Sequence, residues 1–163
     1  MKLAAVFVCL VVLAAAATAE DVNAVAKATY RAVDLAFVKR DAKAADAAMR
    51  PRVAANFKAI VGGRDVTYDN LLANFRGMFA ALTRISNSTT KILSSKSNGS
   101  SATMRVFDAM TAYSKGRDGK MHRYDLTNTS EDVWKKLGGK WKLATSTTLS
   151  ESRKVDGKLL RPV

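Results

Sequence analysis

The sequence predicts a single α+β domain in which three N-terminal helices lie on one face of a curved antiparallel sheet. Two observations lead to this class. Apolar residues recur mainly at helical spacing between Val22 and Leu82, and from Arg84 onward the period changes to two, in segments rich in Thr, Val, Tyr and Trp. Helices followed by a run of antiparallel strands, without an internal repeat, form the pattern of an α+β domain.

The first 19 residues, MKLAAVFVCLVVLAAAATA, are predicted to be a cleaved signal peptide. Lys2 supplies a positive start, an apolar run follows, and residues 17–19 match the small-x-small cleavage pattern before Glu20. The apolar run is shorter than the ~20 residues that a membrane span needs. We therefore expect cleavage after Ala19, a secreted or periplasmic location, a single domain over residues 20–163, and no transmembrane segment in the mature chain.

Three helices are expected before the sheet. VNAVAKATYRAVDLAFVKRD, from Val22, carries helical apolar spacing with one polar side. Asp41 is a candidate N-cap for the second helix, AKAADAAMRP, which is expected to end at Pro51. The third helix is YDNLLANFRGMFAAL, residues 68–82, with candidate caps at Thr67 and Asp69.

One short strand is expected between the second and third helices, and four longer strands after the third. The short strand is RVAANFKAIV, which is closed by Gly62 and Gly63. The longer strands are RISNSTTKILSS, SATMRVFDAMTAYS, KMHRYDLTNTSEDVWKK and KWKLATSTTLSESRKV. Turn residues separate them at 97–99, 116–119 and 138–139.

The last hairpin, DVWKKLGGKWKL, sets two tryptophans among lysines. A two-residue turn at Gly138-Gly139 would pair Leu137 with Lys140, Lys136 with Trp141, Lys135 with Lys142, and Trp134 with Leu143. Because side chains alternate along a strand, Trp134, Trp141 and Leu143 are then expected on one face, and Lys135, Lys140 and Lys142 on the other. We expect the tryptophans to cover the helices and the lysines to face water.

The same register, carried upstream, places Asp132 opposite Thr145, Ser130 opposite Thr147 and Asn128 opposite Leu149. Two registers remain open for the strand at 101–114, because a slip of one residue exchanges its two faces. A bulged turn would bring Met104, Val106, Asp108, Met110 and Ala112 onto the tryptophan face; a tighter turn would bring Phe107, Ala109 and Thr111 there instead. The apolar content favours the bulged turn.

The order of these features resembles the nuclear transport factor 2-like superfamily, which has a cystatin-like layout, and most of all its small secreted branch related to SnoaL-like domains of unknown function. The residues that carry the resemblance are Phe37, Asp41, Gly62-Gly63, Asp132, Trp134, Gly139, Trp141 and Leu143. The resemblance covers residues 22 to 157. It implies a cone-shaped curved sheet wrapped around three helices and an internal pocket, and a homodimer formed through the outer sheet face. Members of the superfamily include both enzymes and binding modules, so the fold does not decide the activity.

Asp132 is the candidate catalytic residue, because a carboxyl group among apolar walls has a raised pKa and can act as an acid or a base near neutral pH. The alternative is a structural aspartate bonded to a backbone N–H or a neighbouring Thr, or paired with Arg105 or Arg123. The other residues expected to line the pocket are Asp108, Tyr124, Asn128, Ser130, Trp134 and Thr145.

Ketosteroid isomerases of this superfamily provide a sharper comparison, since they combine a tyrosine on the first helix, a basic aspartate on the first strand and an acid on a late strand. In this sequence the tyrosine position falls near Val33, one helical turn from Tyr30, and the late acid position falls at Ser130. The first strand offers Asn56 and Lys58 but no carboxylate. The triad does not carry over, so we do not predict steroid isomerase activity.

No cofactor or metal is expected. The chain has one histidine, His122, predicted to be a solvated residue beside a turn, and its one cysteine lies in the signal peptide, so the usual transition-metal ligands are missing from the mature chain. The formal net charge of +13 favours anionic partners in general. Because the basic residues are scattered from Lys27 to Arg161, we expect no specific nucleic-acid partner.

Three functions are compatible with these features. The leading hypothesis is a secreted or periplasmic domain that binds a small, partly apolar molecule. The second is a lyase or isomerase that uses Asp132 as acid or base, with Tyr124, Ser130 or Asn128 orienting the substrate. The third is an envelope-associated structural module that acts through its basic surface.

Overall fold

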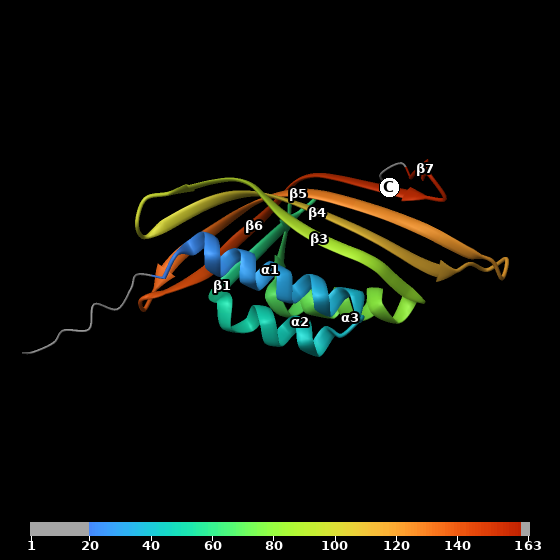
Figure 1. Cartoon of the computed structure of the whole chain (residues 1–163), viewed down its shortest axis with the longest axis horizontal. Helices are drawn as coiled ribbons and strands as arrows, with labels where there is room; N and C mark the ends of the chain where they lie inside the picture. Colours follow the sequence, from blue (N-terminus) through green and yellow to red (C-terminus); the bar gives the residue numbers. More distant parts are fainter. Residues whose placement is uncertain (1–19, 161–163) are drawn as a thin grey trace, which may run out of the picture.

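Three helices lie against the concave face of a seven-stranded sheet (Figure 1). The computed structural model describes residues 20–160, so the predicted signal peptide at residues 1–19 lies outside the described residues. The helices are α1 (Val22–Val38), α2 (Ala42–Met49) and α3 (Tyr68–Ala81), and a short 3-10 turn, Arg50–Arg52, follows α2. All three were expected from the sequence.

The sheet is curved and mostly antiparallel, which confirms the predicted fold class. Its strands are β1 (Val53–Val61), β2 (Arg64–Thr67), β3 (Arg84–Ser97), β4 (Ser101–Lys115), β5 (Met121–Leu137), β6 (Lys140–Val155) and β7 (Lys158–Leu159). The strand order is β2-β1-β6-β5-β4-β3, with β7 added to the far half of β6. One pair, β1 with β6, is parallel. The short strands β2 and β7 were not predicted, because two to four residues are too few to show a period of two.

Side chains at the helix starts explain where the helices begin. The Asp41 carboxylate accepts a hydrogen bond from the Ala44 backbone N–H (2.9 Å), and the Thr67 hydroxyl accepts one from Asn70 (3.3 Å). Each satisfies a backbone donor that the helix itself leaves free. Asp69, the other predicted cap of α3, instead lies in its first turn.

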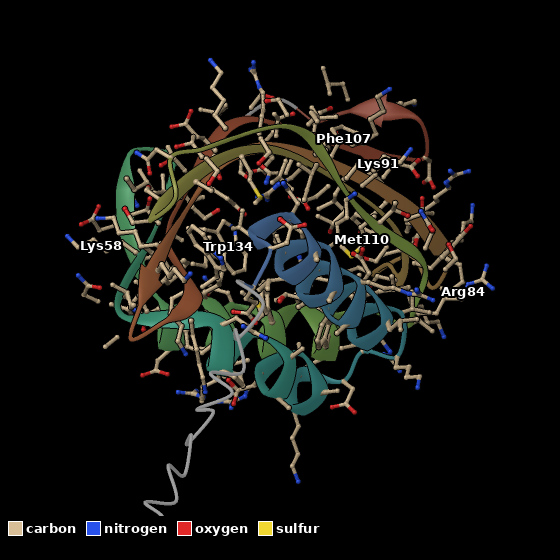
Figure 2. All side chains as sticks on the ribbon, turned by 60° about the vertical axis from the view of Figure 1, so that its left-hand side comes forward. Lys58, Arg84, Lys91, Phe107, Met110 and Trp134 are labelled. Atoms are coloured by element: carbon tan, nitrogen blue, oxygen red, sulfur yellow. The ribbon has the colours of Figure 1, made fainter. Side chains whose placement is uncertain are left out.

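The hairpin of β5 and β6 has the predicted register at its turn, and both tryptophans are buried. All four expected pairs from Leu137–Lys140 to Trp134–Leu143 are present. Trp134 is 0% exposed and Trp141 3% exposed, whereas Lys135 and Lys140 face solvent. Figure 2 shows Trp134 under the arch of the sheet, on the side of α1.

Further from the turn, the predicted register is wrong. β6 carries one extra residue between the partners of Trp134 and Val133, and a second between the partners of Ser130 and Thr129. Asp132 therefore pairs with Ser146, Ser130 with Thr148 and Asn128 with Glu151. Such bulges bend a strand and increase its twist, which a strongly curved sheet requires. The small polar run ATSTT offers no apolar pattern that could have located them.

For β4, the register with the bulged turn is the correct one. Met104 pairs with Asp132, Val106 with Ser130, Asp108 with Asn128 and Met110 with Leu126. Met104 and Val106 are fully buried, so burial of apolar side chains accounts for this choice. Met110 lies inside the curve in Figure 2.

His122 is bound rather than freely solvated. Its Nδ1 lies 2.7 Å from Asp156 Oδ2, and its Nε2 lies 3.1 Å from Asp118 Oδ1. The hydrogen bonds to Asp156 and then Asp118 raise the pKa of His122. The three residues join the turn between β4 and β5 to the turn between β6 and β7, so this histidine belongs to the end of the sheet.

We expect Trp134→Ala to reduce the free energy of unfolding by about 3–5 kcal/mol, because the large buried ring leaves a cavity behind. Guanidinium unfolding followed by circular dichroism measures the change. The control is the neighbouring Lys135→Ala on the solvent face, expected to change it by less than about 0.5 kcal/mol. Equal effects of the two substitutions would show that the tryptophan face is not the core.

Candidate functional site

A cavity of about 430 Å³ lies between the concave face of the sheet and the helices. This volume is within the range of about 300–1,000 Å³ that is usual for small-molecule pockets. Its wall combines apolar side chains from α1, α3 and β1 with a polar strip along the inner face of β4, β5 and β6. The polar strip consists of Asp108, Asn128, Ser130, Asp132 and Ser146.

Asp132 and Ser130 are the most enclosed polar groups of the strip, each with an exposure of 4%. The Tyr30 hydroxyl of α1 donates to Asp132 Oδ2 at 2.6 Å. The hydroxyls of Ser146 and Ser130 donate to Oδ1 at 2.6 and 3.1 Å. The Trp134 indole N–H donates in turn to the Tyr30 oxygen at 3.2 Å. Among residues 20–160, the carboxylate thus has three neutral donors and no cation as a partner.

Burial raises the pKa of Asp132, and the hydrogen bonds from Ser146, Tyr30 and Ser130 act in the opposite direction. Burial and the nearby Asp132 charge also raise the pKa of the Tyr30 hydroxyl, so the tyrosine keeps its proton and acts as a donor. The raised pKa of Asp132 agrees with the expectation from the sequence. The hydrogen-bond partners of Asp132 are hydroxyl groups rather than Arg105 or Arg123.

Asp108 is the second carboxyl in the cavity wall. The Asn128 amide N–H donates to Asp108 Oδ2 at 3.1 Å across the β4–β5 pair. Burial raises the pKa of Asp108, while the Asn128 hydrogen bond lowers it. Asn128 Oδ1 is buried and has no hydrogen-bond partner among the described residues. The wall therefore contains an acceptor that lacks a donor.

The side chain of Asp34 connects α1 to the edge strand β3 through hydrogen bonds. Its carboxylate accepts hydrogen bonds from the Ser88 hydroxyl (2.8 Å), the Thr90 backbone N–H (2.8 Å) and the Thr90 hydroxyl (3.1 Å). Because Asp34 and Tyr30 lie one turn apart on α1, both bonds hold the same helix face toward the cavity.

Aromatic rings from the helices and β1 form the apolar wall. Phe37 of α1 contacts Phe75 of α3 edge to face, with ring centroids 4.9 Å apart. Phe57 of β1 is buried at the other end of this wall and contacts Tyr68 edge to face at 6.2 Å. The exposed lining residues Val61, Asn74, Glu151 and Arg153 indicate where the cavity opens, between α3 and the β1–β6 side of the sheet.

Most of the residues predicted for the pocket lie at this cavity. Asp108, Asn128, Ser130, Asp132 and Trp134 all line it. Two residues do not. Thr145 pairs with Val133 because of the bulge, and therefore lies on the opposite face from Asp132. Tyr124 packs beyond the cavity, against the cluster of Phe79, Ile85 and Ala112.

Tyr30 and Ser146 are the important residues that the sequence did not predict for the site. Tyr30 entered only as the tyrosine nearest to a position at Val33, and nothing in a helical pattern shows which turn will face a strand residue 102 positions away. Because of the bulge on β6, Ser146 rather than Thr145 occupies the position opposite Asp132. A search for any apolar-face tyrosine on the first helix would have found Tyr30, but not its partner.

Two absences hold within residues 20–160. No group of three or more His, Cys, Asp and Glu side chains is placed to hold a metal ion. None of the helices there has the length and apolar character of a membrane crossing.

No protein-family model matches the sequence, and no curated protein matches it. Solved structures do match. A conserved protein from Planctomyces limnophilus superposes with a TM-score of 0.61 at 13% identity, covering 77% of this chain and 92% of its own. A nuclear transport factor 2-like protein of unknown function from Prochlorococcus marinus gives 0.57 at 18% identity, covering 80% and 94%.

A putative scytalone dehydratase from Novosphingobium aromaticivorans gives a TM-score of 0.57 at 10% identity, covering 79% of this chain and 85% of its own. At these identities the likeness concerns the fold. The chain has the nuclear transport factor 2-like fold, and the resemblance seen in the sequence is confirmed at that level.

We expect Tyr30→Phe to lower the free energy of unfolding by about 1–3 kcal/mol, because Asp132 loses a donor and the Trp134 N–H loses its acceptor. The pKa of Asp132 should rise further, since one of the bonds that stabilise its ionised form is gone. Denaturant unfolding and carbon NMR of the carboxyl group measure the two effects. Tyr113→Phe is the control, because its ring packs against Arg84 instead. A Tyr30→Phe protein with unchanged stability and an unchanged Asp132 pKa would show that the Tyr30 hydroxyl does not form these hydrogen bonds with Asp132 and Trp134.

Proposed function

We propose that this protein binds a small, partly apolar molecule in the cavity between its helices and its sheet. The observation that carries the proposal is the cavity of about 430 Å³, which combines an aromatic wall with a few buried polar groups. Binding pockets for small molecules have this composition, because apolar walls supply affinity and a few polar groups supply orientation.

The proposal includes a secreted or periplasmic setting and a homodimer. The leader at residues 1–19 supports the first. Glu20, the expected first residue after cleavage, has a well-defined place: its carbonyl accepts from the Trp141 indole N–H at 2.7 Å, and its carboxylate pairs with Arg52 at 2.8 Å. The homodimer follows from the resemblance and would use the outer sheet face.

Dye binding tests the cavity. N-phenyl-1-naphthylamine is a neutral aromatic dye whose fluorescence rises in apolar surroundings. We expect saturable binding to the wild type, and at least about tenfold weaker binding to Leu71→Trp, whose ring would occupy the cavity. Leu93→Trp is the matched control, since Leu93 is 56% exposed on β3. Equal dye binding by both variants would contradict a ligand site in this cavity. Native mass spectrometry of the secreted protein gives the N-terminus, the oligomeric state and any retained ligand in one spectrum.

A second candidate function is proton-transfer catalysis of the lyase or isomerase type. The specific observation in its favour is a buried carboxyl with a raised pKa, Asp132, directly at the wall of a cavity large enough for a substrate. The likeness to a putative scytalone dehydratase is compatible with this candidate. In this role Asp132 would move a proton to or from the substrate, and Tyr30 would hold the carboxyl in place.

Asp132→Asn separates the two functions. In the catalytic case, hydrogen–deuterium exchange at the carbon next to the carbonyl of small cyclic ketones, followed by NMR in D₂O, should be accelerated by the wild type and slowed about 100-fold or more by the substitution. In the binding case, neither protein accelerates exchange, and affinity for the neutral dye changes only a few-fold. Exchange at the same enhanced rate in both proteins would exclude Asp132 as the acid or base.

A further inference from the structure

The charge in the cavity wall is opposite to the charge of the whole chain. The chain has a formal net charge of +13, yet three carboxyl groups, those of Asp34, Asp108 and Asp132, line the interior. The cations among the lining residues are Arg52 and Arg153. Arg52 pairs with Glu20 and Arg153 pairs with Glu151, so each already has an acidic partner.

The interior carboxyls have only neutral partners among the described residues. Asp132 is bonded to three hydroxyls, Asp108 to an amide, and Asp34 to Ser88 and Thr90. The charges of Asp132 and Asp34 both act on Asp108 and raise its pKa further. A buried anion without a cation is costly, so a positive group that enters this space gains energy that it would not gain in water.

Asn128 Oδ1 is a second, independent feature of the same wall. Its amide is oriented by the hydrogen bond from Nδ2 to Asp108 Oδ2, which leaves the buried oxygen free of any partner in the described part of the chain. An unpaired buried acceptor requires a donor, from water in the free protein or from a ligand in the complex. The cavity wall is therefore complementary to a ligand that carries both a positive charge and hydrogen-bond donors.

We propose that the ligand is an organic amine, whose ammonium group donates to Asn128 Oδ1 and pairs with Asp108, while its apolar body lies against Phe37, Phe57 and Phe75. This inference rests on the proposed small-molecule binding. An ammonium carries one positive charge and up to three donors without an acceptor, which matches a wall of acceptors.

Other charge classes fit less well. An anion would meet three carboxylates and no unpaired cation on the described wall. A bare metal ion would need several ligands at one point, and the described carboxyls do not converge in that way. A neutral alcohol could satisfy Asn128 but would leave the carboxylates without a countercharge.

A matched ligand series tests the head group. Tryptamine, indole-3-ethanol and indole-3-propionate share the indole ring and differ in charge. Their affinities are measured at pH 7 by displacement of N-phenyl-1-naphthylamine from the wild type. A parallel series built on 2-phenylethylamine, 2-phenylethanol and 3-phenylpropionate guards against a mismatch of ring size. In at least one series we expect the amine to bind at least about tenfold more tightly than the alcohol, and the acid to bind most weakly.

Two variants test whether Asp108 is the residue that causes the preference for the amine. Asp108→Asn should remove most of the preference for the amine over the alcohol, with the affinity for the alcohol within about threefold of the wild type. Glu131→Gln removes the same charge from the outer face of the neighbouring strand β5, where Glu131 is exposed, and should leave the preference unchanged.

The outcomes separate the two levels of the proposal. If the dye binds but in both series the alcohol binds as tightly as the amine, or the acid binds best, the amine assignment is wrong and the binding function stands. If the preference exists but Asp108→Asn and Glu131→Gln reduce it equally, the effect is long-range and the assigned position of the ammonium is wrong. If the dye does not bind at all, both the binding function and the amine assignment fail.

Discussion

The hydroxyl of Tyr30 joins helix α1 to the sheet at a place where polar groups are buried between the two layers. It donates to Asp132 on β5 and accepts from Trp134 on the same strand. Both strand residues are almost fully buried, so while the helix is in place neither has water as an alternative partner to the Tyr30 hydroxyl. These hydrogen bonds fix the position of α1 over the sheet. One turn later on α1, Asp34 makes a second connection of this kind, to Thr90 of β3.

The cavity results from how the helices cover a curved sheet. Small residues, Ala26, Ala36 and Ala45, are buried on α1 and α2 and allow close packing there, while the sheet arches over the helices (Figure 1). Large rings then close the wall from α1, α3 and β1 without filling the space. An apolar pocket with one polar side is the result, and a ligand would replace water rather than displace protein atoms.

The separation of charge between surface and interior is the feature that makes the cavity selective in our proposal. Exposed lysines and arginines provide solubility and interact weakly with one another because water screens them. The carboxyls of the cavity lie in a less polar medium, where the same Coulomb interaction is several times stronger. The few interior charges therefore decide which ligand head group is favoured, although they are outnumbered by the cations outside.

Short-range patterns were enough to predict the element types and much of one face of the sheet. The helical spacing, the caps at Asp41 and Thr67 and the Gly138-Gly139 turn each depend on neighbours within a few residues, so the sequence determined them by itself. Asn128, Ser130 and Asp132 could be assigned to the inner face for the same reason, whereas the face of Asp108 depended on which of two registers its strand adopts. The bulges on β6, the partnership of Tyr30 with Asp132 and the place of Ser146 were decided only by the tertiary structure. They depend on how far the sheet must bend to meet the helices, and that is a property of all strands and helices together, which no local run of residues contains.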